Sequence, residues 1–352
     1  MRLGFNFVNG LLDTPLDDLL TFSAQYGASD VVLQSYTGMD PKSRWAVVPG
    51  DNRWELKDLE RLRNQVEFHG LHLEALENVP SFFYDHIMLG GPKRDEQIEN
   101  MIYTIRNIAR AGIPIFGYNW MPSSVWRNSE NALHRAGVKV TAYDHSLHSD
   151  APLTHDRYYT EDEMWDNLEY WIKIITPIAE QEGIRIGIHP ADPPVDSVGG
   201  IPRLLNSFSA YKRLIEIVDS PANAIEFCQG TFSEMPDAAG DGIYEMIEYF
   251  GERKKILYVH FRNVSNAGDP FKEEFINTGH VDMYRAMKLY KKVRFDGVFV
   301  NDHVPITSGD SQWGIRVEPT QMVISKHCWM LRVDSLNFQI IFGACSTRYW
   351  NL

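Results

Sequence analysis

Cysteine is scarce in this chain, and its placement excludes one class of protein. Only three cysteines occur among the 352 residues, namely Cys228, Cys328 and Cys345. An odd and sparse set does not supply the disulfide framework on which small secreted scaffolds depend. We therefore expect a protein of a reducing compartment, the cytoplasm.

Long apolar runs and an excess of positive charge are also missing. No apolar segment approaches the about 20 residues of a membrane-spanning helix, and Met1-Arg2 leads directly into a strand-like segment rather than a signal peptide. The formal net charge is -13, which offers no basic surface to nucleic acid or to an anionic membrane. We expect a small molecule as the partner, and the sequence leaves a homo-oligomer open.

Short apolar runs alternate along the chain with longer amphipathic stretches. The runs are rich in β-branched or aromatic residues and are flanked by Gly, Pro or polar residues, as buried parallel strands are. They comprise Leu3–Phe7, Asp30–Leu33, His72–Glu77, Ile113–Tyr118, Arg185–His189, Ala224–Cys228, Ile256–His260 and Gly297–Val300.

The stretches between these runs have helical spacing of apolar residues. They comprise Leu16–Tyr26, Leu56–Phe68, Asp95–Ala111, Glu161–Glu182, Ala210–Val218, Ile243–Phe250 and Val281–Lys291. Thr160 with Glu163 forms a capping-box signal before the fourth stretch. Strict alternation of eight strands with helices predicts an α/β fold, a (β/α)8 TIM barrel, over residues 1–314. A doubly wound open sheet is the alternative, disfavoured because no Gly-rich phosphate loop opens a helix.

One connection is far longer than the others. It spans about residues 120–160 and contains the alternating segment GVKVTAYD, which we expect to form a small strand or hairpin. Because function in a TIM barrel lies on the βα loops, this insertion is either a lid or oligomer contact, or a decoration without a role.

Polar residues stand at the carboxyl ends of the last four predicted strands. They are His189, Cys228, His260 and Asp302. Taken singly, each is more often structural, but adjacent strands lie about 5 Å apart, so four such side chains can converge on one divalent metal. The thiolate favours zinc or iron, whereas the carboxylate and an oxygen-rich substrate keep manganese open.

Arg262 follows His260 by two residues, so both side chains point to the same face of one strand. A guanidinium beside a metal is suited to a substrate carboxylate. The alternative for Arg262 is a salt bridge at the rim of the barrel.

Several long segments resemble the mannonate dehydratase family. They include MLGGPKRDEQIENMIYTIRNIARAGIPIFGYNWMP, IGIHPADPP, GGIPR, IEFCQGTFSEM, YVHFRNV, EEFINTGHVDM and DHVP, and they extend to about Asp310. The resemblance implies a xylose-isomerase-like TIM barrel and a lyase that converts D-mannonate to 2-keto-3-deoxy-D-gluconate in glucuronate catabolism. It implies Mn2+ or Fe2+ as the metal, held by His189, Cys228, His260 and Asp302.

The resemblance also implies catalytic roles. The catalytic histidine of the family falls on His303, where it would serve as acid or base. We also expect Arg262 to grip the substrate carboxylate, and Tyr118 and Asn119 either to contact hydroxyls or only to pack at the strand end. The best-known members follow the Asp-His pair with Gly-Arg and a later tyrosine-bearing stretch, which this chain lacks. The second acid/base group therefore stays open. The competing readings are a sugar isomerase or epimerase on the same barrel, and an inactive product.

The tail, residues 315–352, does not read as the helix that should close a barrel. It has Pro319 early, two of the three cysteines and no sustained helical period. Residues Gly314–Ser335 can be encoded by a DNA sequence that changes its meaning when one base is inserted after the codon of Gly314. It then encodes an amphipathic helical segment followed by a stop codon. We interpret the tail as an out-of-frame reading that replaces the last helix; the alternative is a genuinely divergent tail.

Overall fold

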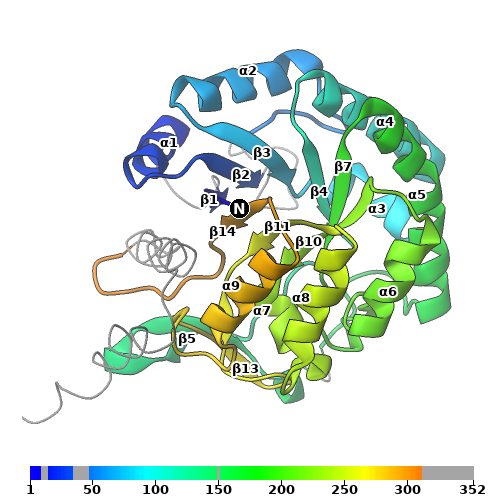
Figure 1. Ribbon diagram of the computed structural model, residues 1–352. Coiled ribbons are helices and arrows are strands. Elements are labelled where there is room, and N and C mark those ends of the chain that lie inside the picture. Colours follow the sequence, from blue (N-terminus) through cyan, green and yellow to red (C-terminus); the bar gives the residue numbers. More distant parts are fainter. Residues whose placement is uncertain (9–14, 35–46, 149–150, 311–352) are drawn as a thin grey trace, which may run out of the picture.

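A computed structural model describes residues 1–8, 15–34, 47–148 and 151–310 of the chain. In this part, eight parallel strands close into a barrel in which neighbours follow sequence order (Figure 1). The predicted (β/α)8 barrel is therefore confirmed, and the open sheet is not observed. The barrel strands are β1 (Arg2–Val8), β2 (Asp30–Gln34), β3 (His72–Glu77), β4 (Ile115–Asn119), β7 (Arg185–His189), β10 (Asn223–Cys228), β11 (Ile256–His260) and β14 (Val298–Val300).

Helices cover the outside of the barrel in the connections between the strands (Figure 1). The longer ones are α1 (Leu16–Gln25), α2 (Leu56–Phe68), α4 (Arg94–Arg110), α5 (Glu161–Glu182), α6 (Phe208–Ile217), α8 (Gly242–Glu252) and α9 (Met283–Lys292). Shorter turns are α3 (Asp85–Met88), α7 (Gln229–Glu234), η2 (Ser81–Phe83), η3 (Arg135–Gly137), η4 (His145–Leu147) and η5 (Pro236–Ala238). The prediction of a missing last helix and an atypical tail at 315–352 lies outside the described residues.

Local sequence signals set both ends of α5. The Thr160 hydroxyl accepts the Glu163 amide, and the Glu163 carboxylate accepts the Thr160 amide at 2.8 Å, so the predicted capping box is present. At the other end Gly183 adopts a left-handed conformation with φ of 75°, which a residue without a Cβ tolerates. The sequence therefore predicts this helix to the residue.

The long insertion contributes to a second sheet beside the barrel. Its hairpin, β5 (Ser129–Leu133) and β6 (Lys139–Tyr143), confirms the predicted strand in GVKVTAYD. Strand β6 pairs antiparallel with β13 (Phe271–Glu274), which pairs with β12 (Asn263–Val264). The insertion after β4 is thus joined to the loop after β11, and both lie at the end of the barrel where the carboxyl ends of the strands converge. A separate hairpin, β8 (Ser197–Val198) with β9 (Ile201–Pro202), follows β7.

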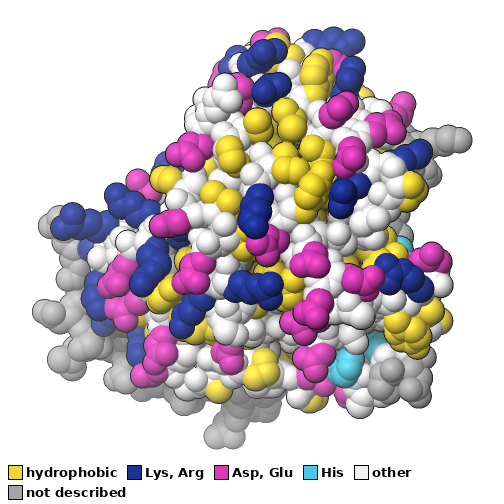
Figure 2. Space-filling model, turned by 90° about the vertical axis from the view of Figure 1, so that its right-hand side faces the viewer, with side chains coloured by type: hydrophobic (Ala, Val, Ile, Leu, Met, Phe, Trp, Pro, Cys, Tyr) yellow, Lys and Arg dark blue, Asp and Glu magenta, His cyan; other side chains and the backbone are white. Residues whose placement is uncertain are grey.

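Apolar packing fills both the barrel and the layer around it. A large cluster lies between the strands and the helices, while a smaller one includes Val32, Ala75, Ile115, Ala224, Tyr258, Val298 and Val300. On the face shown in Figure 2, Lys and Arg side chains alternate with Asp and Glu rather than gathering into one patch. No helix in the described ranges combines the length and the hydropathy needed to cross a membrane.

Candidate metal centre

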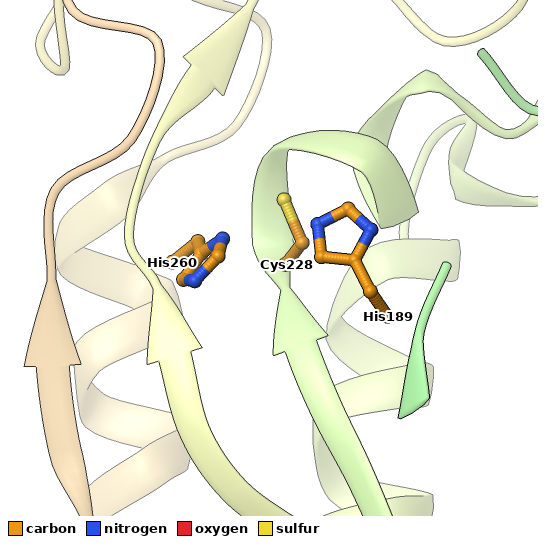
Figure 3. A group of neighbouring side chains, drawn as sticks. All are labelled: His189, Cys228 and His260. Carbon is orange, nitrogen blue, oxygen red and sulfur yellow. The ribbon is translucent and has the colours of Figure 1, made fainter. Parts of the chain in front are cut away.

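The four predicted ligands come together at the carboxyl ends of their strands. His189, Cys228 and His260 are the last residues of β7, β10 and β11, and one ligand atom of each lies within 4.8 Å of the others (Figure 3). Asp302 follows β14 by two residues, and its Oδ2 lies 3.5 Å from His260 Nδ1 and 3.8 Å from Cys228 Sγ. All four side chains are buried. The spacing of adjacent parallel strands is what brings them within reach of one ion.

In each of the two histidines, one ring nitrogen contacts an oxygen of the protein, which leaves the other nitrogen for a metal ion. His189 Nδ1 lies 2.7 Å from the carbonyl oxygen of Pro190, and His260 Nε2 lies 2.9 Å from Oε2 of Glu77. Both contacts place the proton on the nitrogen turned away from the cluster. His260 Nδ1 is buried without a hydrogen-bond partner. A buried nitrogen lone pair of this kind fits a metal ion.

The charges around the cluster also fit a cation. Burial alone would raise the pKa of Cys228, but Arg262 and the two histidines hold it well below its ordinary value. Burial likewise opposes ionisation of Asp302, yet His303, His260 and Arg262 hold its pKa well below the usual range. A thiolate, a carboxylate and two imidazoles are a donor set for divalent zinc, iron or manganese.

Arg262 lies directly against two of these ligands. Its Nε is 3.4 Å from Cys228 Sγ and 3.3 Å from Asp302 Oδ2, and its side chain is 1% exposed. The guanidinium therefore stabilises the ionised form of both the thiol and the carboxyl group.

The other two nitrogens of Arg262 are bound within the protein. Nη1 lies 3.0 Å from a glutamate, and Nη2 lies 3.1 Å from an aspartate and 2.7 Å from a hydroxyl. The full set of acceptors is Glu234, Glu273, Asp192 and Thr231. Arg262 thus forms buried ion pairs within the protein, as the salt-bridge alternative expects. That Arg262 grips a substrate carboxylate stays a prediction.

A glycine makes room for this arginine. Gly230 lies in the first turn of α7, and a Cβ there would come within 2.2 Å of both Cγ and Nε of Arg262. No side chain fits at that distance without moving the guanidinium.

The insertion reaches the same charge network through Arg127. Its guanidinium forms a bidentate pair with Asp192, with Nη2 2.9 Å from Oδ2, and Nη2 also lies 3.3 Å from Glu273. Asp192 and Glu273 are therefore shared between Arg127 and Arg262. Sequence reasoning missed this network, although Asp192 stands only three residues after His189.

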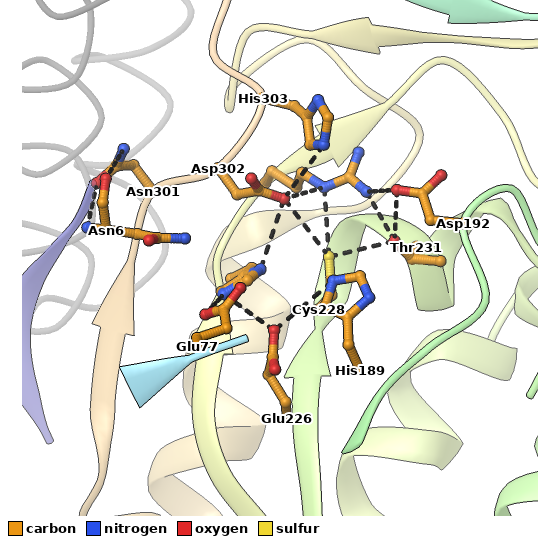
Figure 4. Close-up of polar contacts among 12 residues, drawn as sticks. Asn6, Glu77, His189, Asp192, Glu226, Cys228, Thr231, Asn301, Asp302 and His303 are labelled. Carbon is orange, nitrogen blue, oxygen red and sulfur yellow. Dashed lines mark hydrogen bonds and ion pairs between the residues drawn. The ribbon is translucent and has the colours of Figure 1, made fainter. Parts of the chain in front are cut away.

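His303 lies at the outer side of the cluster. Its Nε2 is 3.8 Å from Asp302 Oδ2, and its side chain is 18% exposed, more than that of Asp302 (Figure 4). Its φ of 42° lies in the left-handed region, which is rare for a residue with a Cβ and concentrates at functional sites.

The two residues at the end of β4 that were predicted to contact substrate, Tyr118 and Asn119, point to opposite sides of the strand. Tyr118 packs edge-on against Trp171 of α5, with ring centroids 5.6 Å apart, so its ring faces the helix layer. This is the strand-end packing alternative, and contact with substrate stays a prediction. Asn119, the next residue, points to the other side of the strand and stands in register with His189. Its Oδ1 accepts the amide of Met121 at 3.1 Å.

Two buried glutamates beneath the histidines were also missed. Besides Glu77, Glu226 lies with its Oε1 3.4 Å from His260 Nε2 and 3.7 Å from His189 Nε2. Burial and the neighbouring Glu77 raise the pKa of Glu226 well above its ordinary value. The sequence did hold a signal for both, because Glu77 ends a predicted strand and Glu226 shares the face of Cys228, two residues on.

Comparison with known proteins identifies related enzymes. The family model described as D-mannonate dehydratase (UxuA) matches residues 24–156 and 152–324. Mannonate dehydratase of Thermotoga neapolitana is 31% identical over 312 residues, covering 77% of this chain and 82% of the relative. Mannonate dehydratase 2 of Halalkalibacterium halodurans is 30% identical over 326 residues, covering 84% and 91%.

Solved structures agree with this and extend the likeness to the fold. The crystal structure of mannonate dehydratase from Streptococcus suis serotype 2 matches with a TM-score of 0.80 and 28% identity, covering 94% of this chain and 92% of that one. A D-psicose 3-epimerase from Clostridium cellulolyticum H10 matches with a TM-score of 0.60 at 10% identity, covering 94% and 99%. The second likeness concerns the barrel alone.

Proposed function

Because this chain belongs to the mannonate dehydratase family, and so to the hydro-lyases, we propose that it removes water from D-mannonate to give 2-keto-3-deoxy-D-gluconate. One observation carries the proposal beyond the family: two imidazoles, a thiolate and a carboxylate from four successive barrel strands meet where barrel enzymes bind substrate.

We propose that His189, Cys228, His260 and Asp302 hold Mn2+ or Fe2+. The orphaned Nδ1 of His260 and the lowered pKa values of Cys228 and Asp302 support this assignment. A divalent ion bound there supplies Lewis-acid stabilisation of the negative charge that develops on the substrate carboxylate. Softness of the thiolate alone does not distinguish iron from zinc, so manganese and iron follow from the family.

The reaction needs two proton transfers that the chain must provide. The C2 proton leaves to a base, the C3 hydroxyl departs as water after it is protonated, and the enol that results becomes the 2-keto acid. We assign one of these transfers to His303, which stands beside Asp302 and is more exposed than the ligands. We assign to Asn119 a contact with a substrate hydroxyl, since it ends β4 in register with His189. Arg262 keeps Cys228 and Asp302 ionised and in position.

The wider setting follows from the same proposal. The substrate is a small sugar acid, the pathway is glucuronate catabolism and the compartment is the cytoplasm, where the buried thiol of Cys228 stays reduced. The insertion hairpin, held to the site through Arg127, is the part of the chain that we propose as a lid or a contact between copies in a homo-oligomer.

The direct test is a dehydration screen. Purified protein loaded with Mn2+ is incubated with D-mannonate and with a panel of other hexonates, and 2-keto acid is measured. We expect product from D-mannonate. If the folded, metal-loaded protein yields none from any hexonate, the proposal fails, and interconversion of a ketohexose under the same conditions would favour an isomerase or epimerase.

A further inference from the structure

We propose that Glu77 is a positioning residue that fixes His260 in the tautomer whose Nδ1 lone pair faces the metal. The inference rests on the metal centre of the proposed function and adds a residue outside the four ligands. It concerns a single hydrogen bond inside the barrel.

Glu77 and His260 meet across the barrel. Glu77 ends β3 and His260 ends β11, which stand opposite each other in the ring of strands. Oε2 of Glu77 lies 2.9 Å from Nε2 of His260, and each side chain is 1% exposed. Because both side chains are buried, water does not compete for this hydrogen bond.

The bond decides where the imidazole proton lies. A neutral imidazole carries one N–H, and Glu77 accepts from Nε2, so Nδ1 keeps its lone pair. That atom is the one without a hydrogen-bond partner, 3.5 Å from Asp302 Oδ2. With the proton on Nδ1 instead, His260 would offer the cluster a donor in place of a ligand. A carboxylate acceptor also increases the basicity of the ligating nitrogen.

The two histidines are held by different means. His189 is fixed by a backbone carbonyl, that of Pro190, which no substitution of a side chain removes. His260 is fixed by a side chain. Glu226 lies 3.4 Å from the same Nε2 but neither of its oxygens has a hydrogen-bond donor. Glu77 is therefore the acceptor to change, and Glu226 is the neighbouring carboxylate to compare with it.

The test measures metal binding rather than turnover. Apoprotein is titrated with Mn2+, and free Mn2+ is followed by electron paramagnetic resonance. We expect Glu77→Leu to weaken binding by about 10–100-fold, the usual cost of losing such an acceptor. Glu77→Gln should stay within about fivefold of the wild type, because its amide oxygen still accepts the Nε2 proton. Glu226→Gln should change the affinity less than Glu77→Leu does.

A second measurement reads the tautomer. Histidine labelled with 15N, with His260 assigned by loss of its signals in His260→Gln, should show a protonated Nε2 in the wild type and in Glu77→Gln. It should show a redistributed proton in Glu77→Leu. Circular dichroism and thermal denaturation establish that each variant folds, and Glu74→Gln, a buried carboxylate earlier on β3, controls for loss of a charge from that strand.

Three results would overturn the inference. They are a folded Glu77→Leu protein with wild-type affinity, an unchanged tautomer in that variant, and a Glu77→Gln protein that keeps the tautomer but loses tenfold or more in affinity. The last result alone decides the matter if Glu77→Leu does not fold. A wild type that binds Mn2+ but leaves mannonate unchanged would defeat the proposed function and not this inference.

Discussion

The Nε atom of Arg262 contacts two of the candidate ligands at once, 3.4 Å from Sγ of Cys228 and 3.3 Å from Oδ2 of Asp302. One N–H thus serves a thiolate and a carboxylate that would otherwise repel each other in a buried site. The rest of the guanidinium is anchored by carboxylates of the protein. The arginine is consequently part of the support of the metal centre, and several predictions depend on that arrangement.

Replacing Cys228 by serine should weaken metal binding on the order of tenfold or more, because a neutral hydroxyl replaces a thiolate ligand. Titration of apoprotein with Mn2+ measures the loss. Ser23→Ala, a change at a buried residue of α1 outside the cluster, is the control. Equal affinity for Mn2+ in Cys228→Ser and the wild type would exclude the thiolate as a ligand.

His303→Asn should leave the affinity for Mn2+ intact and lower kcat by about 10²–10⁴-fold, the typical loss of an acid or base. The histidine stands next to Asp302 without being one of the four ligands. Parallel metal titration and steady-state kinetics separate the two effects. An unchanged kcat would show that His303 is structural.

Gly230→Ala should displace Arg262, since the new Cβ would lie 2.2 Å from its Nε. We expect a destabilisation of about 1–3 kcal/mol, typical of overpacking, together with weaker metal binding. Urea denaturation and Mn2+ titration measure the two. Ser233→Ala on the same helix, whose hydroxyl bonds to the Gln229 carbonyl at 2.5 Å, is the control. If Gly230→Ala had the same free energy of unfolding and the same affinity for Mn2+ as that control, the packing argument would be contradicted.

We expect the protein to lose stability at high pH because His72 loses its proton there. Hydrogen bonds with Asp30 and Glu74 raise its pKa to about 9. A raised pKa in the folded state means that the stabilisation is fully present below the ordinary pKa of histidine and disappears as the pH rises through about 9. Because His72 is half exposed, we expect about 1 kcal/mol or less. Urea denaturation of wild type and His72→Asn should differ at pH 6 and agree at pH 10; a constant difference would contradict this.

The reading of residues 315–352 as out of frame is tested on the gene. Sequencing across the codons of Trp313 to Val317 should show one additional base and a reading frame that ends in an amphipathic helix. A gene that encodes the printed tail without that base would refute the interpretation.

Patterns among neighbouring residues were sufficient to predict the barrel strands and the longer helices. The ends of β3, β7, β11, α2 and α5 agree with the predicted residues. These ends depend on period, on capping by Thr160 and on the glycine that ends a helix, all of which are properties of neighbouring residues. The four candidate ligands came from the same reasoning, because every barrel strand delivers its last residue to one end of the barrel.

Contacts between distant segments were decided by the tertiary structure alone. The sequence shows that Arg262 shares a face with His260, but not that its guanidinium forms ion pairs with Glu234, Asp192 and Glu273. It places Tyr118 at a strand end, yet only the packing against Trp171 shows which side the ring faces. Glu77 and His260 are 183 residues apart, and their hydrogen bond exists because closing the barrel brings β3 opposite β11. Periodicity acts over a few residues, whereas which buried charges neutralise one another is settled when the barrel closes and water is excluded.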